Sequence, residues 1–484
     1  MTRHGAEALE WADDEVGDAK LGHAGRTKRL VTMLRRAATH PAGKVSEVFT
    51  LDAERQGAYD FLEDERITPQ MLADASVAAA VARAREHAFV FVAVDGSSLT
   101  FTDRPHKKEL GAVGTPRFGC RGLKVMTGYA CDPQGVPVGI LDQSWWQRTQ
   151  APAQKSSAKR KRSAKRALSE KETQRWIDVI QASTEALRAS DTRAWFQLDR
   201  EGDSAEVLKA LTTSGQWFTV RSSTNRRLCK DNLSQPKRTD ADRLYLREEL
   251  AKKKVLGTYS LDLLEGPKRE ARAARMSVRV AKVVLRLRHY WTKQLTTFEV
   301  TAVWAKETSR IPKGEKGVDW LLFTNRDVQS FDDAQRVIRG YALRWRIEEL
   351  HKTWKSGACR VEDAQLHSKS AIVKWATILL TVAIRIERLK QLARQTPDAP
   401  AKPEFSPAEF RALLYLKSKQ KKRNETIVDN PSIELAVRWI ADLGGYTGKS
   451  SGGPPGSITI GRGLRDLLVV ASVIEDFPEE NRRK

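Results

Sequence analysis

Two short apolar runs, each followed by an aspartate, most constrain what this chain can fold into. Residues 88–94 read Ala-Phe-Val-Phe-Val-Ala-Val, and residues 194–198 read Ala-Trp-Phe-Gln-Leu. Continuous apolar runs of this kind are typical of strands that are buried on both faces of a sheet. Strand-like runs at 122–130 and 136–141 follow the first, and helix and strand patterns alternate after that. This order predicts an α/β domain with a central mixed sheet.

A second group of strand patterns lies further along the chain. Residues 225–275 are polar and highly charged, and strand patterns then appear at 277–288, 296–305 and 319–324. Because these strands come between the αβ units and a long helical stretch, they predict a β-rich insertion at about 223–330.

Helical patterns flank the α/β region on both sides. Leu30, Met33 and Leu34 recur at helical spacing beside Arg26 and Arg29. A basic helical module of this kind suits DNA binding, although an ordinary helical subdomain would have the same pattern. Residues after 365 are mostly helical. The predicted domains are therefore 1–87, 88–364 and 365–484.

The charge of the chain indicates a polyanionic partner. The formal net charge is +23 and the sequence pI is about 9.9. Nucleic acid is the commonest such partner, and a membrane surface is the competing one. No apolar run approaches the 18 residues of a spanning helix, and the first residues lack the apolar part of a signal peptide. We therefore expect a cytoplasmic protein with no membrane partner.

The four cysteines indicate neither disulfides nor zinc. They show no CxxC pairing and have no histidine partner at zinc-binding spacing. We interpret all four as reduced thiols without a metal role: Cys120, Cys131, Cys229 and Cys359.

Between residues 341 and 355, five chemically active residues are spaced 3, 4, 4 and 3 apart. On one α-helix these steps place all of them on one face, along a stripe roughly 20 Å long. The stripe carries one carboxylate among cations and a phenol, which suits a metal-binding acid within a phosphate-binding surface. A solvated charged face is the alternative. The five residues are Tyr341, Arg344, Glu348, Lys352 and Lys355.

Three carboxylates stand out as candidate metal ligands. Asp95 and Asp199 each follow a buried strand, where an acid is poorly tolerated unless it faces a site. Glu348 belongs to the cationic stripe. Brought together, the three could hold two Mg²⁺ ions through hard oxygen ligands, roughly 3.5–4 Å apart as in other two-metal phosphodiester enzymes. Each strand-end aspartate alone is a weak signal, because turns favour aspartate.

These residues match a known family motif. The motif reads Tyr, two residues, Arg, three residues, Glu, six residues, Lys, and here it is matched from Tyr341 to Lys355 without a departure. The first acid lies in Asp-x-x-Ser-Leu, residues 95–99, and the second in Asp-Arg-Glu-x-Asp, residues 199–203. The chain resembles the Tn-five-type cut-and-paste DNA transposases of the insertion-sequence-four group, over nearly its whole length.

The resemblance implies a ribonuclease-H-like catalytic core with a β-strand insertion, between an N-terminal helical DNA-binding domain and a C-terminal helical dimerisation domain. Asp95, Asp199 and Glu348 would be the catalytic triad and would bind two Mg²⁺, with Mn²⁺ as a substitute. The enzyme would nick the transposon end, form and open a hairpin, and join the 3′ end to target DNA. Double-stranded DNA and a second copy of the chain would be its partners.

The resemblance also assigns DNA contacts outside the triad. The motif's phenol and cations would hold the hairpin-side strand, and a tryptophan of the insertion would stack on a flipped base, although a core tryptophan is the alternative. The expected contacts are Tyr341, Arg344, Lys352, Lys355, Trp320, Arg221, Arg26 and Arg29.

Two departures from the family pattern and two alternative functions complete the sequence-based interpretation. Gly96 stands where a threonine is typical, and residues 155–166 are unusually cationic. A non-catalytic inhibitor or domesticated regulator is one alternative, against which the three acids and the basic N-terminal module argue. A repair or junction nuclease is the other, against which the intact motif argues.

Overall fold

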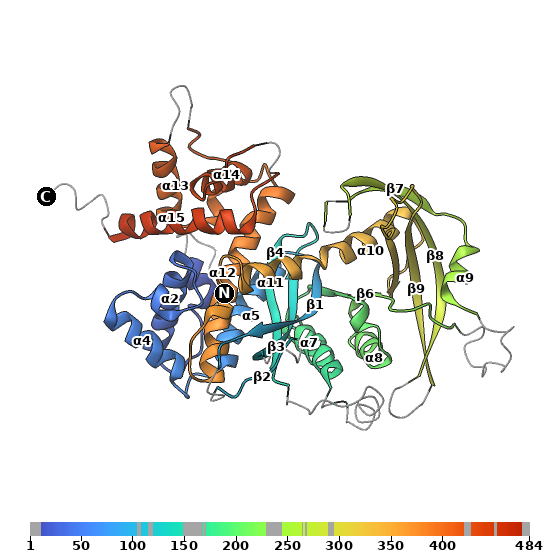
Figure 1. Ribbon diagram of the computed structural model, residues 1–484, viewed down its shortest axis with the longest axis horizontal. Helices are drawn as coiled ribbons and strands as arrows, with labels where there is room; N and C mark the ends of the chain where they lie inside the picture. The colour runs from blue at the N-terminus through green and yellow to red at the C-terminus, as the bar shows by residue number, and fades with distance from the viewer. Residues whose placement is uncertain are drawn as a thin grey trace.

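A sheet lies at the centre of the molecule, and the helices of the two chain ends gather together on one side of it in the computed structural model (Figure 1). The structure describes residues 11–103, 108–114, 120–148, 168, 171–228, 244–263, 265–266, 269–288, 295–420, 427–449 and 453–476. The cationic segment 155–166 and Cys229 lie outside them. The mixed α/β architecture with helical flanking domains is the one that the sequence predicts.

Ten strands of the described residues form one mixed sheet. Their order is β2-β3-β1-β5-β6-β10-β9-β8-β7, and β4 also pairs with β3. The strands are β1 Phe89–Thr100, β2 Gly111–Ala112, β3 Arg121–Cys131, β4 Pro137–Trp146, β5 Arg193–Leu198, β6 Trp217–Arg221, β7 Gly257–Leu263, β8 Arg272–Arg288, β9 Leu295–Glu307 and β10 Asp319–Thr324.

The two strands that precede the predicted acids are direct neighbours. β1 pairs in parallel with β5, and the last pair in register is Val94 with Leu198. Asp95 and Asp199 are the next residues on the two strands, so they come off the same edge of the parallel pairing. Neighbouring strands lie about 4.8 Å apart. The strand register therefore brings the two aspartates to one edge of the sheet.

The sequence prediction that Asp95 ends its strand is wrong. β1 continues to Thr100, because its antiparallel pairing with β3 runs on from Asp95 opposite Thr127 to Thr100 opposite Gly122. Only the parallel pairing with β5 stops before Asp95. The acid thus projects from the middle of a strand that is paired on one side.

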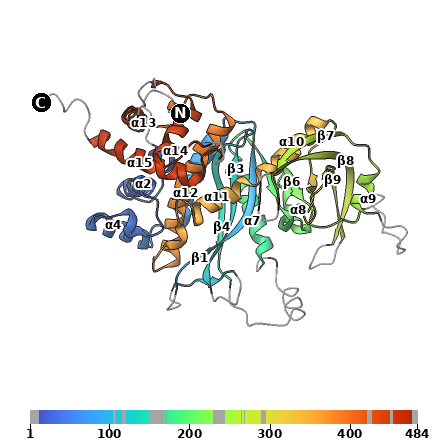
Figure 2. The ribbon, with the colours of Figure 1, turned by 45° about the horizontal axis from the view of Figure 1, so that its top comes forward.

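The strands of the predicted insertion extend the central sheet. β10 pairs antiparallel with β6, and β9, β8 and β7 follow it outward. In both ribbon views this part of the sheet lies on the side away from the terminal helices (Figures 1 and 2). The domain boundaries 88–364 and about 223–330 stay predictions, because the pairing of β10 with β6 gives the insertion no separate sheet.

The helices surround this sheet and form the two flanking domains. They are α1 Trp11–Val16, α2 Ala24–Thr39, α3 Val45–Val48, α4 Asp52–Glu63, α5 Pro69–Ala84, α7 Glu172–Ala186, α8 Ala205–Thr213, α9 Leu246–Ala251, α10 Phe331–Leu343, α11 Arg346–Lys355, α12 Lys369–Gln395, α13 Pro407–Lys419, α14 Ile433–Leu443 and α15 Ser457–Asp476. Short 3₁₀ turns are η3 Arg200–Gly202, η5 Val361–Asp363 and η6 Lys402–Glu404.

Helix α12 is the shared core element of the two flanking domains. It contacts α2, α4 and α5 of the N-terminal region, α14 and α15 of the C-terminal region, and α11 of the predicted catalytic domain. Its side chains are buried on nearly every face. A helix that is buried on nearly every face requires partners on all sides, which explains why the two chain ends lie together.

Helix α15 packs most of its apolar side chains against other helices of its own chain. Leu464 and Leu467 of α15 are fully buried in the core cluster that includes α12. Val470 and Ile474 of the same apolar surface are half-buried, and the contact of this surface with a partner subunit stays a prediction. The large apolar side chains that α15 exposes include Val469 and Val473.

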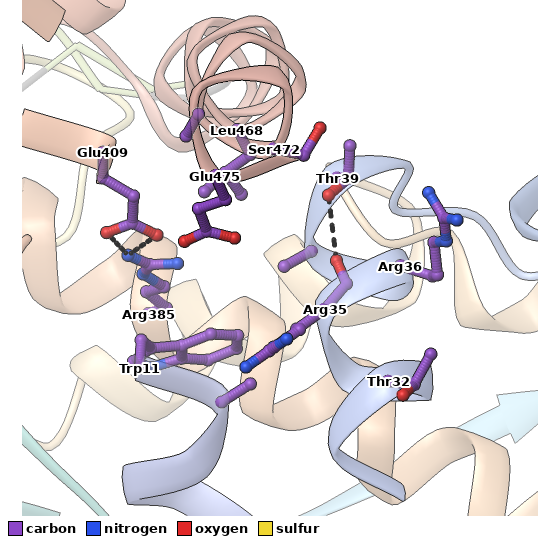
Figure 3. Close-up of a pocket in the computed structure, with 13 residues that line it drawn as sticks. Trp11, Thr32, Arg35, Arg36, Thr39, Arg385, Glu409, Leu468, Ser472 and Glu475 are labelled. Atoms are coloured by element: carbon purple, nitrogen blue, oxygen red, sulfur yellow. Dashed lines mark hydrogen bonds and ion pairs between the residues drawn. The ribbon is translucent and has the colours of Figure 1, made fainter. Parts of the chain in front are cut away.

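A pocket marks the place where the two chain ends meet (Figure 3). Arg35 and Thr39 of α2 line one side, and Ser472 of α15 lines the other. Arg385 of α12 closes the floor, where it donates to both carboxylate oxygens of Glu409 at 2.8 and 2.7 Å. A buried charge pair with two short bonds is a structural element, because either charge alone would be costly to bury.

Two further sequence expectations concern cysteines and membranes. Among the described residues, Cys120, Cys131 and Cys359 are not joined in disulfides. Within the part of the chain that the structure describes, none of the helices has both the length and the apolar character needed to span a bilayer.

Candidate active site and DNA-contacting residues

The two strand-borne acids are both anchored to the backbone next to them. The Asp95 carboxylate accepts a hydrogen bond from the Gly96 N–H at 2.7 Å. Asp199 is the N-cap of η3 and accepts from the Glu201 N–H at 2.8 Å. These bonds use one oxygen of each carboxylate and leave the other for a further partner.

The helix that carries Glu348 is separate from the one that carries Tyr341. The sequence predicts one continuous helix for the stripe, and this is wrong, because α10 ends at Leu343 and α11 begins at Arg346. Between them the backbone forms bonds of the tighter i→i−3 type, including Arg344 N–H to the Tyr341 carbonyl. The tightening breaks the regular stripe and leaves the Trp345 side chain 61% exposed.

The Arg344 guanidinium lies among the predicted triad. One of its nitrogens is 2.7 Å from a carboxylate oxygen of Asp95 and 3.6 Å from one of Glu348. Burial lowers the pKa of Arg344, but Asp95, Asp199 and Glu348, together with Tyr341, outweigh it and raise that pKa. The arginine therefore already supplies positive charge at the point where the three acids converge.

The pKa of Asp95 is strongly raised by its surroundings. Burial is the main cause that raises the pKa of Asp95 to about 7, and Glu348 and Asp199 raise it further while Arg344 and the Gly96 N–H oppose them. The pKa of this carboxyl is raised by burial and by two other carboxyls. To be fully ionised at neutral pH, it requires more positive charge nearby than one arginine provides.

The donor set fits a hard divalent cation, but the cluster is not preformed. Three carboxylates with oxygens left over are the ligands that Mg²⁺ prefers. Among the described residues, however, no group of three His, Cys, Asp or Glu side chains is arranged closely enough to hold a metal ion. The carboxylates repel one another and Arg344 keeps its ion pair with Asp95, so the three acids surround Arg344 without coming close enough together to hold an ion.

Three of the predicted DNA contacts form one cluster, built from strands β6 and β10 and from helix α10. The Trp320 and Tyr341 rings are edge to face, with centroids 5.5 Å apart. Arg221 donates to the Tyr341 hydroxyl at 3.5 Å and to the Asp319 carbonyl at 3.2 Å. Tyr341 is buried, whereas Trp320 and Arg221 are half-buried. The structure thus brings together residues more than 100 positions apart in the chain.

The two lysines of the motif lie near the end of α11. Lys352 is exposed, and Lys355 is 4.0 Å from Glu362. Glu362 in turn accepts from the Thr100 N–H at 2.8 Å, which ties this region to the end of β1. Both lysines therefore lie on the same helix as Glu348, and Lys352 is open to solvent.

The two arginines of α2 differ in what surrounds them. Arg26 donates to the Leu21 carbonyl at 3.1 Å and lies 3.3 Å from Asp64. Arg29 is exposed, and its guanidinium rests against Gly57, where an added Cβ would come within 2.7 Å of it. Gly57 therefore leaves room for Arg29 on the surface of this domain.

His351, which belongs to the matched segment, is a core residue. It is buried on α11, with its ring near the Trp354 ring. Burial lowers its pKa to about 3, and Lys355 and Arg344 add to the effect. The imidazole is neutral at physiological pH and contributes packing.

Comparison with known proteins identifies the two flanking domains. Residues 8–67 match the family model described as "Transposase DNA-binding", and residues 381–476 match the one described as "Transposase Tn5 dimerisation domain". The two matches support a Tn5-type transposase. The transposase therefore carries a DNA-binding domain at one end and a dimerisation domain at the other, which supports DNA and a second copy of the chain as partners.

The two matches fall inside the flanking domains that the sequence predicts, at 1–87 and 365–484, and the boundaries themselves stay predictions. What sequence reasoning missed in this transposase is a polar network beside α11. Its signal was present in the chain, because Glu387, Lys390 and Gln391 interrupt an otherwise apolar helix.

Proposed function

We propose that this transposase excises and inserts a DNA element through Asp95, Asp199 and Glu348. The observation that carries the proposal is the convergence of the three acids on Arg344, with the pKa of Asp95 raised to about 7. A carboxyl with a perturbed pKa beside two further carboxyls is typical of a catalytic centre. The strand order β4-β3-β1-β5-β6, antiparallel and then parallel, supports a ribonuclease-H-like core.

The metal follows from the ligands. Two Mg²⁺ ions, or Mn²⁺ in their place, would be held by the oxygens of Asp95, Asp199 and Glu348. Bound there, divalent ions would activate the attacking oxygen and stabilise the leaving oxygen of a phosphodiester. The use of these ions, the membership of the insertion-sequence-four group and the cytoplasmic location are predictions of the same proposal.

The chain's own residues would position the DNA. Lys352 and Lys355 offer positive charge to the phosphates on the helix that carries Glu348. Arg344 offers the planar guanidinium that suits a phosphate best. When it turns to a phosphate, it leaves its ion pair with Asp95, and the acids lose the charge that balances them. Binding of DNA and of the metal would then support each other.

The hairpin step would use the aromatic cluster. The Trp320 ring is edge to face with Tyr341 and is half-buried, so a base extruded from a sharply bent strand could stack on its exposed part. Arg221 and Tyr341 are hydrogen-bonded to each other and border the same place. Nicking, hairpin formation, hairpin opening and joining would all occur at the one set of acids.

The test is a series of alanine variants of the three acids on the element's own terminal repeat. We expect Asp95→Ala, Asp199→Ala and Glu348→Ala each to lose nicking, hairpin formation and strand transfer together. Binding of the end in a gel-shift assay should survive, because the DNA-binding domain is untouched. Pre-cut and uncut ends, with Mg²⁺ and with Mn²⁺, separate the steps. Substantial strand transfer by Glu348→Ala would falsify the proposal.

A further inference from the structure

A buried polar stripe on α12 lies against the helix that carries Glu348. Glu387, Lys390 and Gln391 are spaced 3 and 1 apart, so they share one face of α12. Glu387 is 1% exposed and Lys390 is 4% exposed. Burying such groups is costly unless each finds partners, so this stripe requires an explanation in terms of what it holds.

Glu387 joins three helices at one carboxylate. Its Oε1 accepts from the Thr353 hydroxyl of α11 at 2.5 Å and from the Ser457 hydroxyl of α15 at 2.6 Å. Its Oε2 is 2.5 Å from the Lys390 ammonium, which also donates to the Ser457 hydroxyl at 3.0 Å. Ser457 is the first residue of α15, the last helix of the dimerisation domain.

The same stripe holds α11 at a second point. Glu349 accepts from the Gln391 amide at 3.1 Å, and it lies 3.5 Å from Lys390 and 2.9 Å from Arg346. Glu349 and Thr353 are four residues apart, so they lie on the same face of α11. The stripe therefore holds α11 along one face over a full turn.

Holding this face sets the direction of the neighbouring residue. Successive residues of an α-helix are about 100° apart around its axis. Glu348 comes directly before Glu349, so fixing Glu349 and Thr353 fixes the angle at which Glu348 points toward Asp95. Because Glu387 bonds to both Thr353 and Ser457, this angle also depends on the position of the start of α15.

Adhesion between the helices does not require these polar groups. The Trp354 indole of α11 already donates to the Ala376 carbonyl of α12 at 3.0 Å, and Leu350 packs in the same buried core. Apolar side chains would bind the helices at least as tightly, since buried ion pairs often stabilise less than hydrophobic replacements. What the directional bonds add is a single rotational setting of α11.

We propose that Glu387 is a positioning residue that orients Glu348 and links its orientation to the start of α15 in the dimerisation domain. The inference rests on the proposed function, because it takes Glu348 as a metal ligand. Glu387 accepts one hydrogen bond from Thr353 of α11 and another from Ser457 of α15. A displacement of the α15 start, as when the domain engages a second copy, would therefore reach Glu348 through one carboxylate.

The test removes the bond between α11 and Glu387 and leaves the shape of the site. Thr353→Val has the same volume and lacks the hydroxyl, and Thr353→Ser restores it. The main measurement is Mn²⁺ binding to the complex of the full chain with end DNA, followed by the loss of the free Mn²⁺ signal in electron paramagnetic resonance. We expect Thr353→Val to weaken Mn²⁺ binding about tenfold, as loss of outer-shell support does at metal sites, and Thr353→Ser to recover it.

A second pair of variants tests the link to the dimerisation domain. Ser457→Ala removes the bond from α15 to Glu387, and Ser472→Ala removes an exposed hydroxyl further along the same helix that bonds only within it. Weaker Mn²⁺ binding is expected for Ser457→Ala and not for Ser472→Ala. Equal effects of the two, or none for either, would overturn the link.

Two measurements make the outcome decisive. The unfolding midpoint and end binding are recorded for each variant, and Thr353→Val must keep both for its Mn²⁺ result to support the proposal. If Thr353→Val binds Mn²⁺ like the parent, or if Thr353→Ser fails to recover a loss, Glu387 has only a structural role. Failure of the proposed function is separate, since it would appear as nicking by Glu348→Ala.

Discussion

Two adjacent glutamates on α11 have opposite surroundings. The Glu348 side chain is 40% exposed, and the cation nearest to it, Arg344 at 3.6 Å, is shared with Asp95. Glu349 is held by Arg346, Lys390 and a glutamine amide. The first therefore belongs to a group with too little positive charge, and the second to a group whose charges and hydrogen bonds are matched.

The difference teaches how to separate function from support in this molecule. A polar group whose partners are complete stabilises the fold, because removing it leaves other buried groups unpaired. A group whose partners are incomplete is maintained at a cost in stability and is available for a ligand. The same contrast recurs between Arg26 and Arg29, between Trp304 and Trp320, and along α15.

The largest expected effect comes from neutralising Glu348 and Glu349 in two separate variants. Glu348→Gln should lower nicking at least about a thousandfold, as loss of a catalytic group does. It should leave the free energy of unfolding unchanged or higher, because it relieves repulsion with Asp95. Glu349→Gln should lower the free energy of unfolding by about 1–3 kcal/mol and keep nicking within about tenfold. Nicking rates and urea unfolding check both.

The opposite result would break the comparison. If Glu349→Gln abolished nicking in a folded protein while Glu348→Gln remained active, the chemistry would belong to the matched group.

The next effect concerns the outward face of α15. Val469 is 39% exposed and Val473 is 54% exposed, whereas Leu467 is fully buried. Val469→Asp with Val473→Asp should block formation of paired-end complexes and leave binding of single ends unchanged, because the change places charge on an interface between two copies. Leu467→Ala should instead lower the free energy of unfolding by about 2–5 kcal/mol. Native gels with one and two ends distinguish them, and normal pairing by the double variant would contradict the assignment.

The hairpin step separates two tryptophans of the insertion, Trp304 and Trp320. Trp320→Ala should spare nicking and slow hairpin formation by about 1–3 kcal/mol, roughly ten- to a hundredfold, because a flipped base loses its stacking partner. Trp304 is buried and donates its indole N–H to Asp319 at 2.8 Å. Trp304→Phe should lower the unfolding midpoint and leave the ratio of hairpin to nicked product unchanged. A time course on a labelled end measures both, and equal loss of both steps in Trp320→Ala would make Trp320 structural.

The smallest expected effect compares the two arginines of α2. Arg29→Glu should weaken end binding and reduce the slope of log K against log salt by about one, because one phosphate contact is lost. Arg26→Gln should mainly lower the unfolding midpoint, since Arg26 holds the Leu21 carbonyl and Asp64. Gel shifts at several salt concentrations give the slope. An unchanged slope for Arg29→Glu would remove Arg29 from the DNA-binding surface.

Much of the fold could be predicted because its signals are local. The runs at 88–94 and 194–198 became β1 and β5, and the long helical stretch 365–396 became α12. Apolar runs and helical periodicity depend on near neighbours in the chain, so they survive in any tertiary context. The pairing of these two strands, which brings Asp95 and Asp199 together, was implied by the resemblance to a ribonuclease-H-like core and not by a local pattern.

What could not be predicted depends on pairing across long separations in the chain. β1 runs past Asp95 because β3 pairs with it there, and the insertion joins the main sheet because β10 finds β6. The break between α10 and α11 contains no glycine or proline, so no helix-breaking residue predicts it. It coincides with the ion pair that Arg344 makes with Asp95, 249 residues away in the chain.

The residue types at the candidate site were determined by the chain alone. The spacing from Tyr341 to Lys355 and the two strand-following aspartates specified the acids, the cations and the family they resemble. Only the tertiary structure decided which of two adjacent glutamates is left with incomplete partners. That choice depends on the rotation of α11 about its axis, and the rotation is set by Thr353 and Glu349 against a buried stripe of α12. A helical pattern fixes which residues share a face, but the neighbours packed against that face decide where it points.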